Sequence, residues 1–176
     1  DSSDNKEKAF SLMRKKKINS VPVLGKNKTL KDLISIEEIL GAEDMSNIVV
    51  IMAGGKGKRL RPFTKTCPKP MLKINGTPIL EIIIKKFIVQ GFFNFRISVN
   101  YLKDQIVDYF NDGNIFGVSI KYLFEDKPLG TAGALKLLNI KNKEPVIIMN
   151  GDILTEINFK ELISVHNEQK ADITMV

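Results

Sequence analysis

Ile48-Val49-Val50-Ile51-Met52-Ala53-Gly54-Gly55-Lys56-Gly57-Lys58-Arg59 is the stretch of sequence that decides the fold. It begins with a continuous apolar run, which is typical of a strand buried on both faces of a parallel sheet. A loop with three glycines and several cations follows directly. In open α/β sheets, ligands bind where the strands end and such loops begin. The stretch therefore predicts an α/β sheet with a binding loop at its edge.

Helices and strands alternate after this stretch. Apolar residues recur at helical spacing before Gly91, which is a typical helix stop. We expect helices at residues 78–90, 103–110, 131–138 and 159–168, and strands at residues 48–52, 95–100, 118–124, 145–149 and 172–176. Repeated β-α-β units with right-handed crossovers predict a doubly wound, mainly parallel sheet. Because the last expected strand reaches the end of the chain, we expect the natural protein to continue.

Residues 1–44 have a different character, and a short polar joint at residues 41–47 separates them from the rest. We expect a helix at residues 5–17, strands at residues 20–24 and 30–34, and a short helix at residues 36–40. About 45 residues in this α+β order bury little surface alone, so the segment should pack against something else. The chain therefore divides into residues 1–44 and residues 45–176.

The positive charge of the chain is concentrated in one place. The net charge is +7, and six cations with no acid lie between Gly54 and Pro70. Such charge calls for an anionic partner, either nucleic acid or a small phosphorylated ligand. The single Cys67 and the single His166 leave no disulfide and no soft-ligand metal cluster. With a polar amino terminus and no apolar run near the roughly 20 residues of a membrane span, we expect a cytoplasmic protein without membrane contact.

The glycine loop is suited to phosphate, because glycines let backbone N–H groups approach an anion closely. It is not a Walker A loop, since Met52 stands where that pattern needs glycine, and it departs from the dinucleotide fingerprint at Leu60. The alternative is a simple glycine turn with exposed lysines. Pro68-Lys69-Pro70 favours the phosphate interpretation, because two prolines fix the backbone around one lysine.

Three motifs in order resemble those of the sugar-1-phosphate nucleotidyltransferases. They are Gly54-Gly55-Lys56-Gly57-Lys58-Arg59-Leu60-Arg61-Pro62 with Pro68-Lys69-Pro70, then Pro128-Leu129-Gly130-Thr131-Ala132-Gly133-Ala134, then Asn150-Gly151-Asp152. Lys58 departs from the family, which usually has Thr or Ser at this position. The resemblance implies a Rossmann-like nucleotidyltransferase fold, with residues 45–176 as its amino-terminal, nucleotide-binding part. It also implies a homo-oligomer.

The resemblance implies a role for each matching residue. The residues that would bind the nucleotide are Ala53, Gly54, Gly55, Gly57, Lys58, Gly130 and Thr131. Arg59 would bind the leaving pyrophosphate, Lys69 the phosphates, and Asp152 a Mg²⁺ ion. One carboxylate is enough for Mg²⁺, which takes its other ligands from phosphate oxygens and water. The implied reaction transfers a nucleoside monophosphate from a nucleoside triphosphate to a sugar-1-phosphate and releases pyrophosphate.

Glu125 lies five residues before Gly130, where the family's base-reading residue usually lies. Many uridylyl and thymidylyl enzymes have Gln there, whereas a carboxylate only accepts hydrogen bonds. Guanine offers two adjacent donors, so Glu125 favours GTP. The alternative is a solvent-facing loop acid.

The first segment resembles the back half of a CBS domain. The matching residues are Ile18-Asn19-Ser20-Val21-Pro22-Val23-Leu24 and Leu33-Ile34-Ser35-Ile36-Glu37-Glu38. CBS domains work in pairs and often bind adenine nucleotides, so the resemblance implies such a ligand at a complete pair, with Ser35 on the ribose. A structural or partner-contact role is the alternative.

Two rival functions remain open at this point. One is a catalytically inactive CBS and nucleotide-binding regulatory protein. The other is a nucleic-acid-binding module, which the absence of Trp and the presence of only three Tyr disfavour. We therefore expect no nucleic acid partner.

Overall fold

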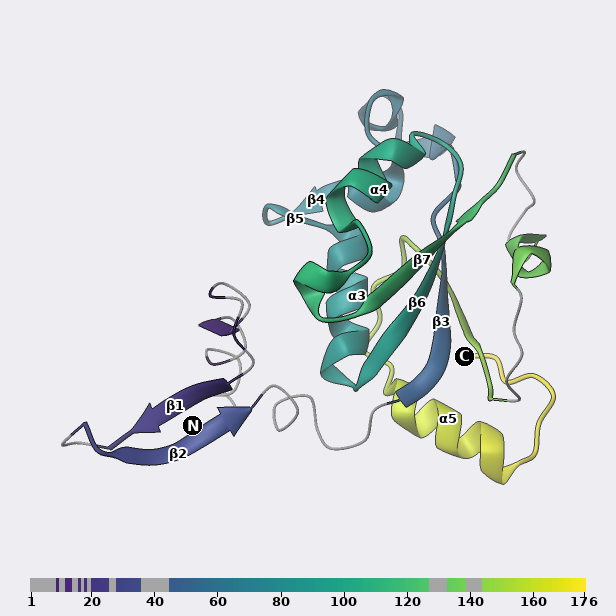
Figure 1. Ribbon diagram of the computed structural model, residues 1–176. Coiled ribbons are helices and arrows are strands. Elements are labelled where there is room, and N and C mark those ends of the chain that lie inside the picture. Colours follow the sequence, from purple (N-terminus) through teal and green to yellow (C-terminus); the bar gives the residue numbers. More distant parts are fainter. Residues whose placement is uncertain are drawn as a thin grey trace.

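The computed structural model describes residues 9, 12–13, 16, 18, 20–25, 28–35, 45–126, 133–138 and 144–176. Its centre is a four-stranded sheet in the order β7-β6-β3-β8 (Figure 1). The strands are β3 (Met45–Met52), β6 (Phe92–Val99), β7 (Ser119–Phe124) and β8 (Ile147–Asn150). Neighbouring strands run parallel throughout. The predicted parallel sheet is therefore confirmed.

The order of the strands reverses beside β3. The chain first moves outward from β3 to β6 and β7, and then returns to place β8 on the other side of β3. Helices α3 (Ile79–Val89) and α4 (Lys103–Phe110) make the outward connections. The short 3₁₀ helix η5 (Gly133–Leu137) belongs to the return connection. This reversal creates a switch point between the carboxyl ends of β3 and β8, where open α/β sheets bind ligands.

The larger part of the core lies on one face of the sheet. Helices α3, α4 and α5 (Phe159–Glu168) pack there against side chains that alternate along the strands, such as Val49 and Ile51 of β3. Phe87 of α3 is fully buried, stacking on Phe159 and meeting Phe92 and Phe95 edge to face. Burying each such side chain contributes about 1.5–3 kcal/mol. The same aromatic cluster therefore fixes α3 and α5 on the sheet.

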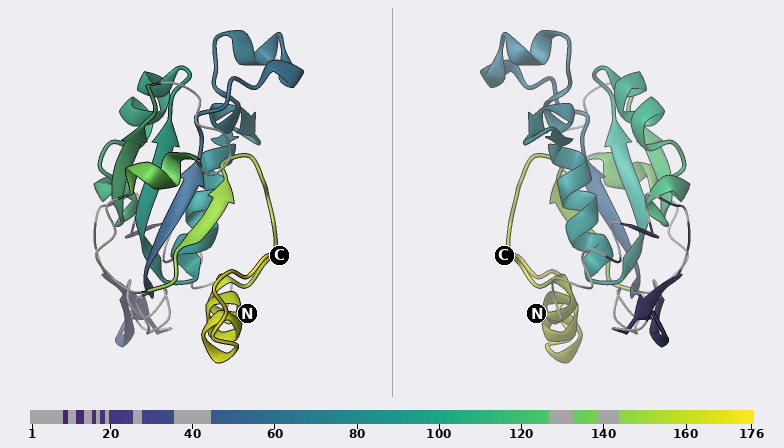
Figure 2. Two further views of the ribbon diagram at one scale, coloured as in Figure 1. Left: turned by 90° about the vertical axis from the view of Figure 1, so that its right-hand side faces the viewer. Right: turned by 90° about the vertical axis from the view of Figure 1, so that its left-hand side faces the viewer.

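The opposite face carries a smaller cluster. Val50 of β3 and Leu123 of β7 pack there against Ala134 of η5. In Figure 2, η5 lies across the sheet on the side away from α3. The return connection thus covers one face while the outward connections cover the other, as the doubly wound arrangement requires.

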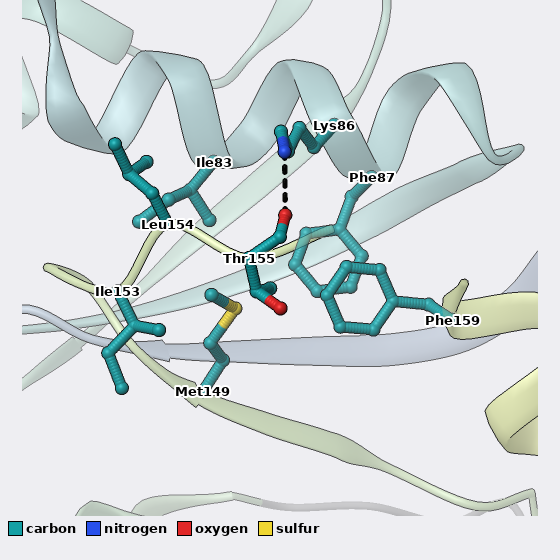
Figure 3. A pocket seen from close by; sticks show the side chains of 8 residues that line it. All are labelled: Ile83, Lys86, Phe87, Met149, Ile153, Leu154, Thr155 and Phe159. Carbon is teal, nitrogen blue, oxygen red and sulfur yellow. Dashed lines mark hydrogen bonds between the residues drawn. The ribbon is translucent and has the colours of Figure 1, made fainter. Parts of the chain in front are cut away.

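The segment after β8 is attached to α3. Figure 3 shows Lys86 of α3 beside Thr155, with Met149 and Phe159 packed below. The Lys86 Nζ donates a hydrogen bond to the Thr155 carbonyl oxygen (2.6 Å) and forms an ion pair with Glu156. These contacts hold the chain that leaves the carboxyl end of β8.

Short elements connect β3 to α3. They are the 3₁₀ helices η1 (Lys58–Leu60), η2 (Phe63–Lys65) and η3 (Lys69–Met71), followed by β4 (Lys73–Ile74) and β5 (Thr77–Pro78). Asn75 and Gly76 join β4 to β5 with φ of 50° and 83°, as a tight hairpin requires. A further 3₁₀ helix, η4 (Asn114–Phe116), precedes β7.

The amino-terminal segment contains an antiparallel hairpin of β1 (Ser20–Leu24) and β2 (Leu30–Ser35). Both predicted strands of this segment are therefore confirmed. Of the predicted helix at residues 5–17, the described residues Ala9, Leu12, Met13 and Lys16 are helical. The predicted helix at residues 36–40 lies outside the described residues. The division of the chain near residue 44 stays a prediction.

Two predicted elements differ in the structure. Residues 172–176 form no strand, and Ile173, Met175 and Val176 are exposed. An apolar run becomes a strand only where a neighbour pairs with its backbone, and no strand among the described residues does so here. The predicted helix at residues 131–138 is a 3₁₀ helix over residues 133–137, while residues 131 and 132 lie outside the described part.

Candidate functional site

A cavity of about 730 Å³ opens at the carboxyl ends of β3 and β8. The loop after β3, the start of η3 and the turn after β8 line it, and one residue after β7 completes the wall. The lining residues are Met52, Ala53, Gly54, Gly55, Lys56, Gly57, Lys58, Arg59, Leu60, Lys69, Pro70, Glu125, Asn150, Gly151 and Asp152. The topology thus brings together most of the predicted site residues at the switch point.

The glycine loop that lines this cavity has backbone N–H groups without a partner among the described residues. Across the part of the chain that the structure describes, none of the backbone N–H groups of residues 54–59 donates a hydrogen bond. Unpaired backbone donors of this kind need an acceptor from solvent or from a ligand. A run of them lining a cavity is suited to an anion.

Gly57 requires its glycine for two reasons. Its φ of +57° is one that other residues rarely adopt, and a Cβ there would lie 2.9 Å from the Cγ2 atom of Thr64. The buried Thr64 hydroxyl donates a hydrogen bond to the Gly57 carbonyl oxygen (2.8 Å). This bond closes the base of the loop that carries the cations Lys58 and Arg59.

The cations of the loop remain accessible. Lys56, Lys58 and Arg59 are exposed, and all three line the cavity. The 3₁₀ turn η1 places Lys58 and Arg59 directly after Gly57, with the Leu60 N–H donating to the Gly57 carbonyl oxygen (2.9 Å). Three exposed positive side chains therefore border the same cavity as the residues with unpaired N–H groups.

Lys69 and Asp152 form an ion pair in the cavity. Pro68 has an extended backbone and Pro70 is buried, so that Lys69 starts η3 with its side chain directed at the turn after β8. Asp152 is brought there by Gly151, whose N–H donates to the Met52 carbonyl oxygen (2.9 Å). A Cβ on Gly151 would lie 3.0 Å from that same oxygen, which is a tight contact, so glycine favours this close approach. The pair joins the ends of β3 and β8.

Glu125 lies at another part of the cavity wall and is half-buried. Its carboxylate accepts a hydrogen bond from the Ser98 hydroxyl, and its carbonyl oxygen accepts one from the Asn100 side-chain amide. Its own N–H donates to the Val99 carbonyl oxygen (3.0 Å). The Glu125 Oε1 atom lies 3.1 Å from the Cβ position of Gly54, so a larger residue there would press on the Glu125 carboxylate. The side chain and the carbonyl group of Glu125 are thus both held by hydrogen bonds at the cavity wall.

The remaining predicted site residues fall into two groups. Ala53 is buried, and its N–H donates to the Ser98 carbonyl oxygen (2.9 Å), so it supports the start of the loop. Gly130 and Thr131 lie outside the described residues. Cys67 stands near the site but is half-buried, and burial raises the pKa of its thiol above the ordinary value despite nearby Lys73. It is therefore a poor nucleophile at neutral pH.

The structure adds residues that sequence reasoning missed. Ser98 and Asn100 hold Glu125, while Thr64 holds Gly57. Their positions near the carboxyl ends of expected strands or in the glycine-loop segment were the available signals. The residue pairings themselves are tertiary contacts, which a single sequence does not reveal.

Together these features define a class of protein. The sheet is a parallel α/β sheet with a switch point, and its cavity has unpaired N–H groups and cations along one part and fixed carboxylates elsewhere. This is the architecture of α/β proteins that bind phosphorylated ligands at strand ends. Residues 48–176 match the nucleotidyl transferase family, and the chain belongs to that family.

Relatives of different base specificity resemble the chain. It is 34% identical over 139 residues to UTP–glucose-1-phosphate uridylyltransferase of Synechocystis, which covers 72% of this chain and 36% of that protein. It is 33% identical to mannose-1-phosphate guanylyltransferase of Mycobacterium tuberculosis, covering 72% and 35%. It is 39% identical to D-glycero-alpha-D-manno-heptose 1-phosphate guanylyltransferase of Aneurinibacillus thermoaerophilus, covering 72% and 55%. The match thus spans between about a third and just over a half of each relative.

Solved structures agree with the fold. HddC from Yersinia pseudotuberculosis, crystallised in complex with GMP-PN, has a TM-score of 0.61 and 34% identity, covering 68% of this chain and 54% of that one. A putative glucose-1-phosphate thymidylyltransferase from Bacillus anthracis has a TM-score of 0.64 and 26% identity, covering 70% and 51%. No helix among the described residues is long and apolar enough to span a membrane.

Proposed function

We propose that the protein transfers a nucleoside monophosphate from a nucleoside triphosphate to a sugar-1-phosphate and releases pyrophosphate. The observation that carries this proposal is the Lys69–Asp152 ion pair in the cavity that the glycine loop borders. A cation and a metal-binding carboxylate held beside unpaired backbone donors suit a polyphosphate substrate. Relatives that are named as uridylyl and guanylyl transferases of sugar-1-phosphates support the same reaction.

The triphosphate would lie along the glycine loop. The unpaired N–H groups of residues 54–59 would donate to phosphate oxygens, and the exposed side chains of Lys58 and Arg59 would neutralise the β- and γ-phosphates. Charge-assisted hydrogen bonds to phosphate are stronger than neutral ones. The loop therefore holds the leaving pyrophosphate, with Arg59 as its main cation.

Lys69 would act at the α-phosphate. Its ammonium is held at the switch point by Asp152, which fixes its position before substrate arrives. Nucleotidyl transfer depends on positioning and on neutralising the charge at the phosphorus, with little covalent work for the protein. Lys69 thus binds and orients the α-phosphate for attack by an oxygen of the sugar-1-phosphate.

Asp152 would also hold Mg²⁺. Among the described residues, Asp152 and Glu125 are the acidic side chains that line the cavity, and a carboxylate oxygen is the ligand that Mg²⁺ prefers. A bound Mg²⁺ neutralises phosphate charge and helps to orient the triphosphate. Asp152 fits this role because it can serve Lys69 and a metal ion with its two oxygens.

GTP is the proposed nucleotide. The Ser98 hydroxyl holds the Glu125 carboxylate, which only accepts hydrogen bonds, and guanine has two adjacent donors to offer it. A uracil carbonyl would instead face a negative charge. The guanylyltransferases among the relatives agree with this choice, and the uridylyltransferase is the competing case.

Calorimetric titration of this chain with GTP, UTP, CTP and ATP, with and without Mg²⁺, tests the site. We expect saturable, Mg²⁺-dependent binding with GTP tightest. Pyrophosphate release by the full-length protein with sugar-1-phosphates then tests the reaction. Strong binding of long polyanions with a steep salt dependence, and none of mononucleotides, would contradict the proposal.

Glu125→Gln tests the base separately. It keeps the size of the side chain and replaces an acceptor-only group with one that donates and accepts. We expect the preference for GTP over UTP to fall or reverse. An unchanged preference would remove Glu125 from base recognition while leaving the transferase proposal intact.

We also propose that residues 1–44 are the back half of a CBS domain. The β1–β2 hairpin agrees with this, and Ser35 ends β2. An adenine nucleotide would bind only at a complete pair of such domains. Titration of AMP into a protein with the complete tandem tests the ligand, and no detectable binding would leave a structural or partner-contact role. A homo-oligomeric state and a cytoplasmic location also stay predictions.

A further inference from the structure

Tyr101 connects the start of α4 to the glycine-loop segment. Its hydroxyl lies 3.0 Å from the carbonyl oxygen of Thr64 and 2.9 Å from that of Lys65, and its one proton is shared between these two acceptors. Gln105, one turn further along, donates its side-chain amide to the carbonyl oxygen of Thr66 (2.8 Å). Three successive carbonyl groups are thus held by two side chains of one segment. Figure 1 shows α4 beginning beside the short turns that follow β3.

These contacts act on the cavity through Thr64. The Thr64 hydroxyl donates to the Gly57 carbonyl oxygen, and the Gly57 Cβ position would also lie 3.3 Å from the Cβ atom of Lys69. The anchored residues 64–66 therefore stand between α4 and the loop of unpaired N–H groups. The exposed residues between Gly57 and Thr64 include Lys58 and Arg59.

We propose that Tyr101 is a positioning residue for the part of the site that would bind the triphosphate. This inference rests on the proposed function. Its hydroxyl fixes residues 64–65, these fix Gly57 through Thr64, and Gly57 sets the direction of the N–H groups and of η1. Tyr101 is not one of the residues that line the cavity. Its effect therefore falls on phosphate binding and spares the base at Glu125.

The chain supplies a matched control for removing this hydroxyl. Tyr122 also donates its hydroxyl to a backbone carbonyl, that of Asn111 (2.7 Å), and it does not line the cavity. Tyr101→Phe and Tyr122→Phe each remove one hydroxyl group, which is one hydrogen-bond donor to the backbone. A general loss of stability would thus be similar for both, whereas an effect on the phosphate loop belongs to Tyr101 alone.

The first experiment compares GTP with GMP by calorimetry, with Mg²⁺, in wild type and both variants. Loss of one hydrogen bond corresponds to about a five-fold change in an equilibrium constant. We expect Tyr101→Phe to weaken the affinity for GTP about five-fold and the affinity for GMP less than two-fold. Tyr122→Phe should change neither affinity. If Tyr101→Phe weakened the affinities for GTP and GMP equally, or left the affinity for GTP unchanged, the positioning role would be overturned. Gln105→Leu should act in the same direction as Tyr101→Phe.

The second experiment needs no nucleotide. Amide hydrogen exchange measures how often two backbone hydrogen bonds of this segment open. They are the bond from the Leu60 N–H to the Gly57 carbonyl oxygen and the bond from the Lys65 N–H to the Pro62 carbonyl oxygen (3.0 Å). We expect faster exchange of both in Tyr101→Phe and no change in Tyr122→Phe. Unchanged exchange would overturn the anchoring. If the wild type bound no nucleotide, the proposed function would fail, while exchange would still decide whether Tyr101 anchors the loop.

Discussion

Lys69 and Asp152 form an ion pair although 83 residues separate them in the sequence. Lys69 follows β3 and Asp152 follows β8, and these strands are neighbours only because the strand order reverses at β3. The pair is part-exposed, and such pairs contribute only about 0–1 kcal/mol to stability. Its place in the cavity therefore points to a role in ligand binding rather than in holding the fold together.

Replacing Lys69 by Met should impair the reaction and leave the fold intact. Removing one preorganised charge from a transition state typically lowers turnover by roughly 100-fold or more. We expect a loss of that size in pyrophosphate release by the full-length protein, with an unfolding free energy close to that of wild type.

Lys86→Met is the control for this change. Lys86 is similarly exposed, 31% against 34% for Lys69, and it also forms an ion pair, with Glu156. It does not line the large cavity. Activity should survive in Lys86→Met, and a similar loss in both variants would mean that Lys69 acts only through stability.

Gly55→Ala should weaken nucleotide binding without destabilising the protein. A Cβ at Gly55 meets nothing within 4 Å, and its backbone needs no positive φ, so the unfolding free energy should stay within about 0.5 kcal/mol of wild type. The added methyl group would occupy the space through which an anion approaches the N–H groups. We expect about a ten-fold weaker affinity for GTP by calorimetry, since close backbone approach is lost.

Gly76→Ala should destabilise the protein without weakening nucleotide binding. Its φ is +83° in the β4–β5 turn, away from the cavity lining, so Ala there costs about 1–2 kcal/mol. Chemical denaturation should detect this loss while GTP affinity is unchanged. If Gly55→Ala bound GTP normally, the glycine loop would not be the phosphate site.

Ser98→Ala should reduce base selectivity. Ser98 is fully buried, and its hydroxyl holds the Glu125 carboxylate at the cavity wall. Without this donor the carboxylate is less fixed, and we expect the preference for GTP over UTP to fall about five-fold. Competition binding with the two nucleotides measures it. Equal affinities for GTP and UTP in wild type would show that this pair does not select guanine.

Tyr122 should ionise well above the ordinary pKa of a tyrosine. Burial, together with the negative charge of Asp112, raises the pKa of Tyr122 to about 12. The unfolded value is about 10, so the neutral phenol stabilises the fold fully below pH 10, and this contribution is lost as the pH rises through 12. Absorbance titration should show one phenol with a midpoint near 12, absent in Tyr122→Phe. A midpoint near 10 for that phenol would mean that Tyr122 is hydrated.

Regular elements were predictable where the sequence pattern is local. The helices at residues 103–110 and 159–168 and the strand at residues 20–24 have the predicted bounds. Amphipathic spacing and capping residues such as Asn158, whose side chain accepts from the Glu161 N–H, decide such elements within a few residues. The glycine loop was recognisable for the same reason, because its motif is contiguous.

Contacts between distant residues were not predictable in this way. The pairing of Ser98 with Glu125 and that of Tyr101 with Thr64 depend on the order of strands in the sheet. The expected strand at residues 172–176 failed for a related reason, since apolar composition does not supply a pairing partner. Sequence reasoning therefore identified loops that meet at one cavity, and it missed the side chains that hold them.

The return of the chain to β3 also determines when the site comes into existence during synthesis. Asn47 and Pro145, which are hydrogen-bonded at the start of β3 and β8, lie 98 residues apart. Contacts over such separations form late, because the intervening chain must first be ordered. A nascent chain on the ribosome would hold its glycine loop long before Asp152 has emerged. If nucleotide binds as proposed, its binding would indicate that β8, the last strand of the central sheet, has docked, and the nucleotide would stabilise only chains that have completed this step.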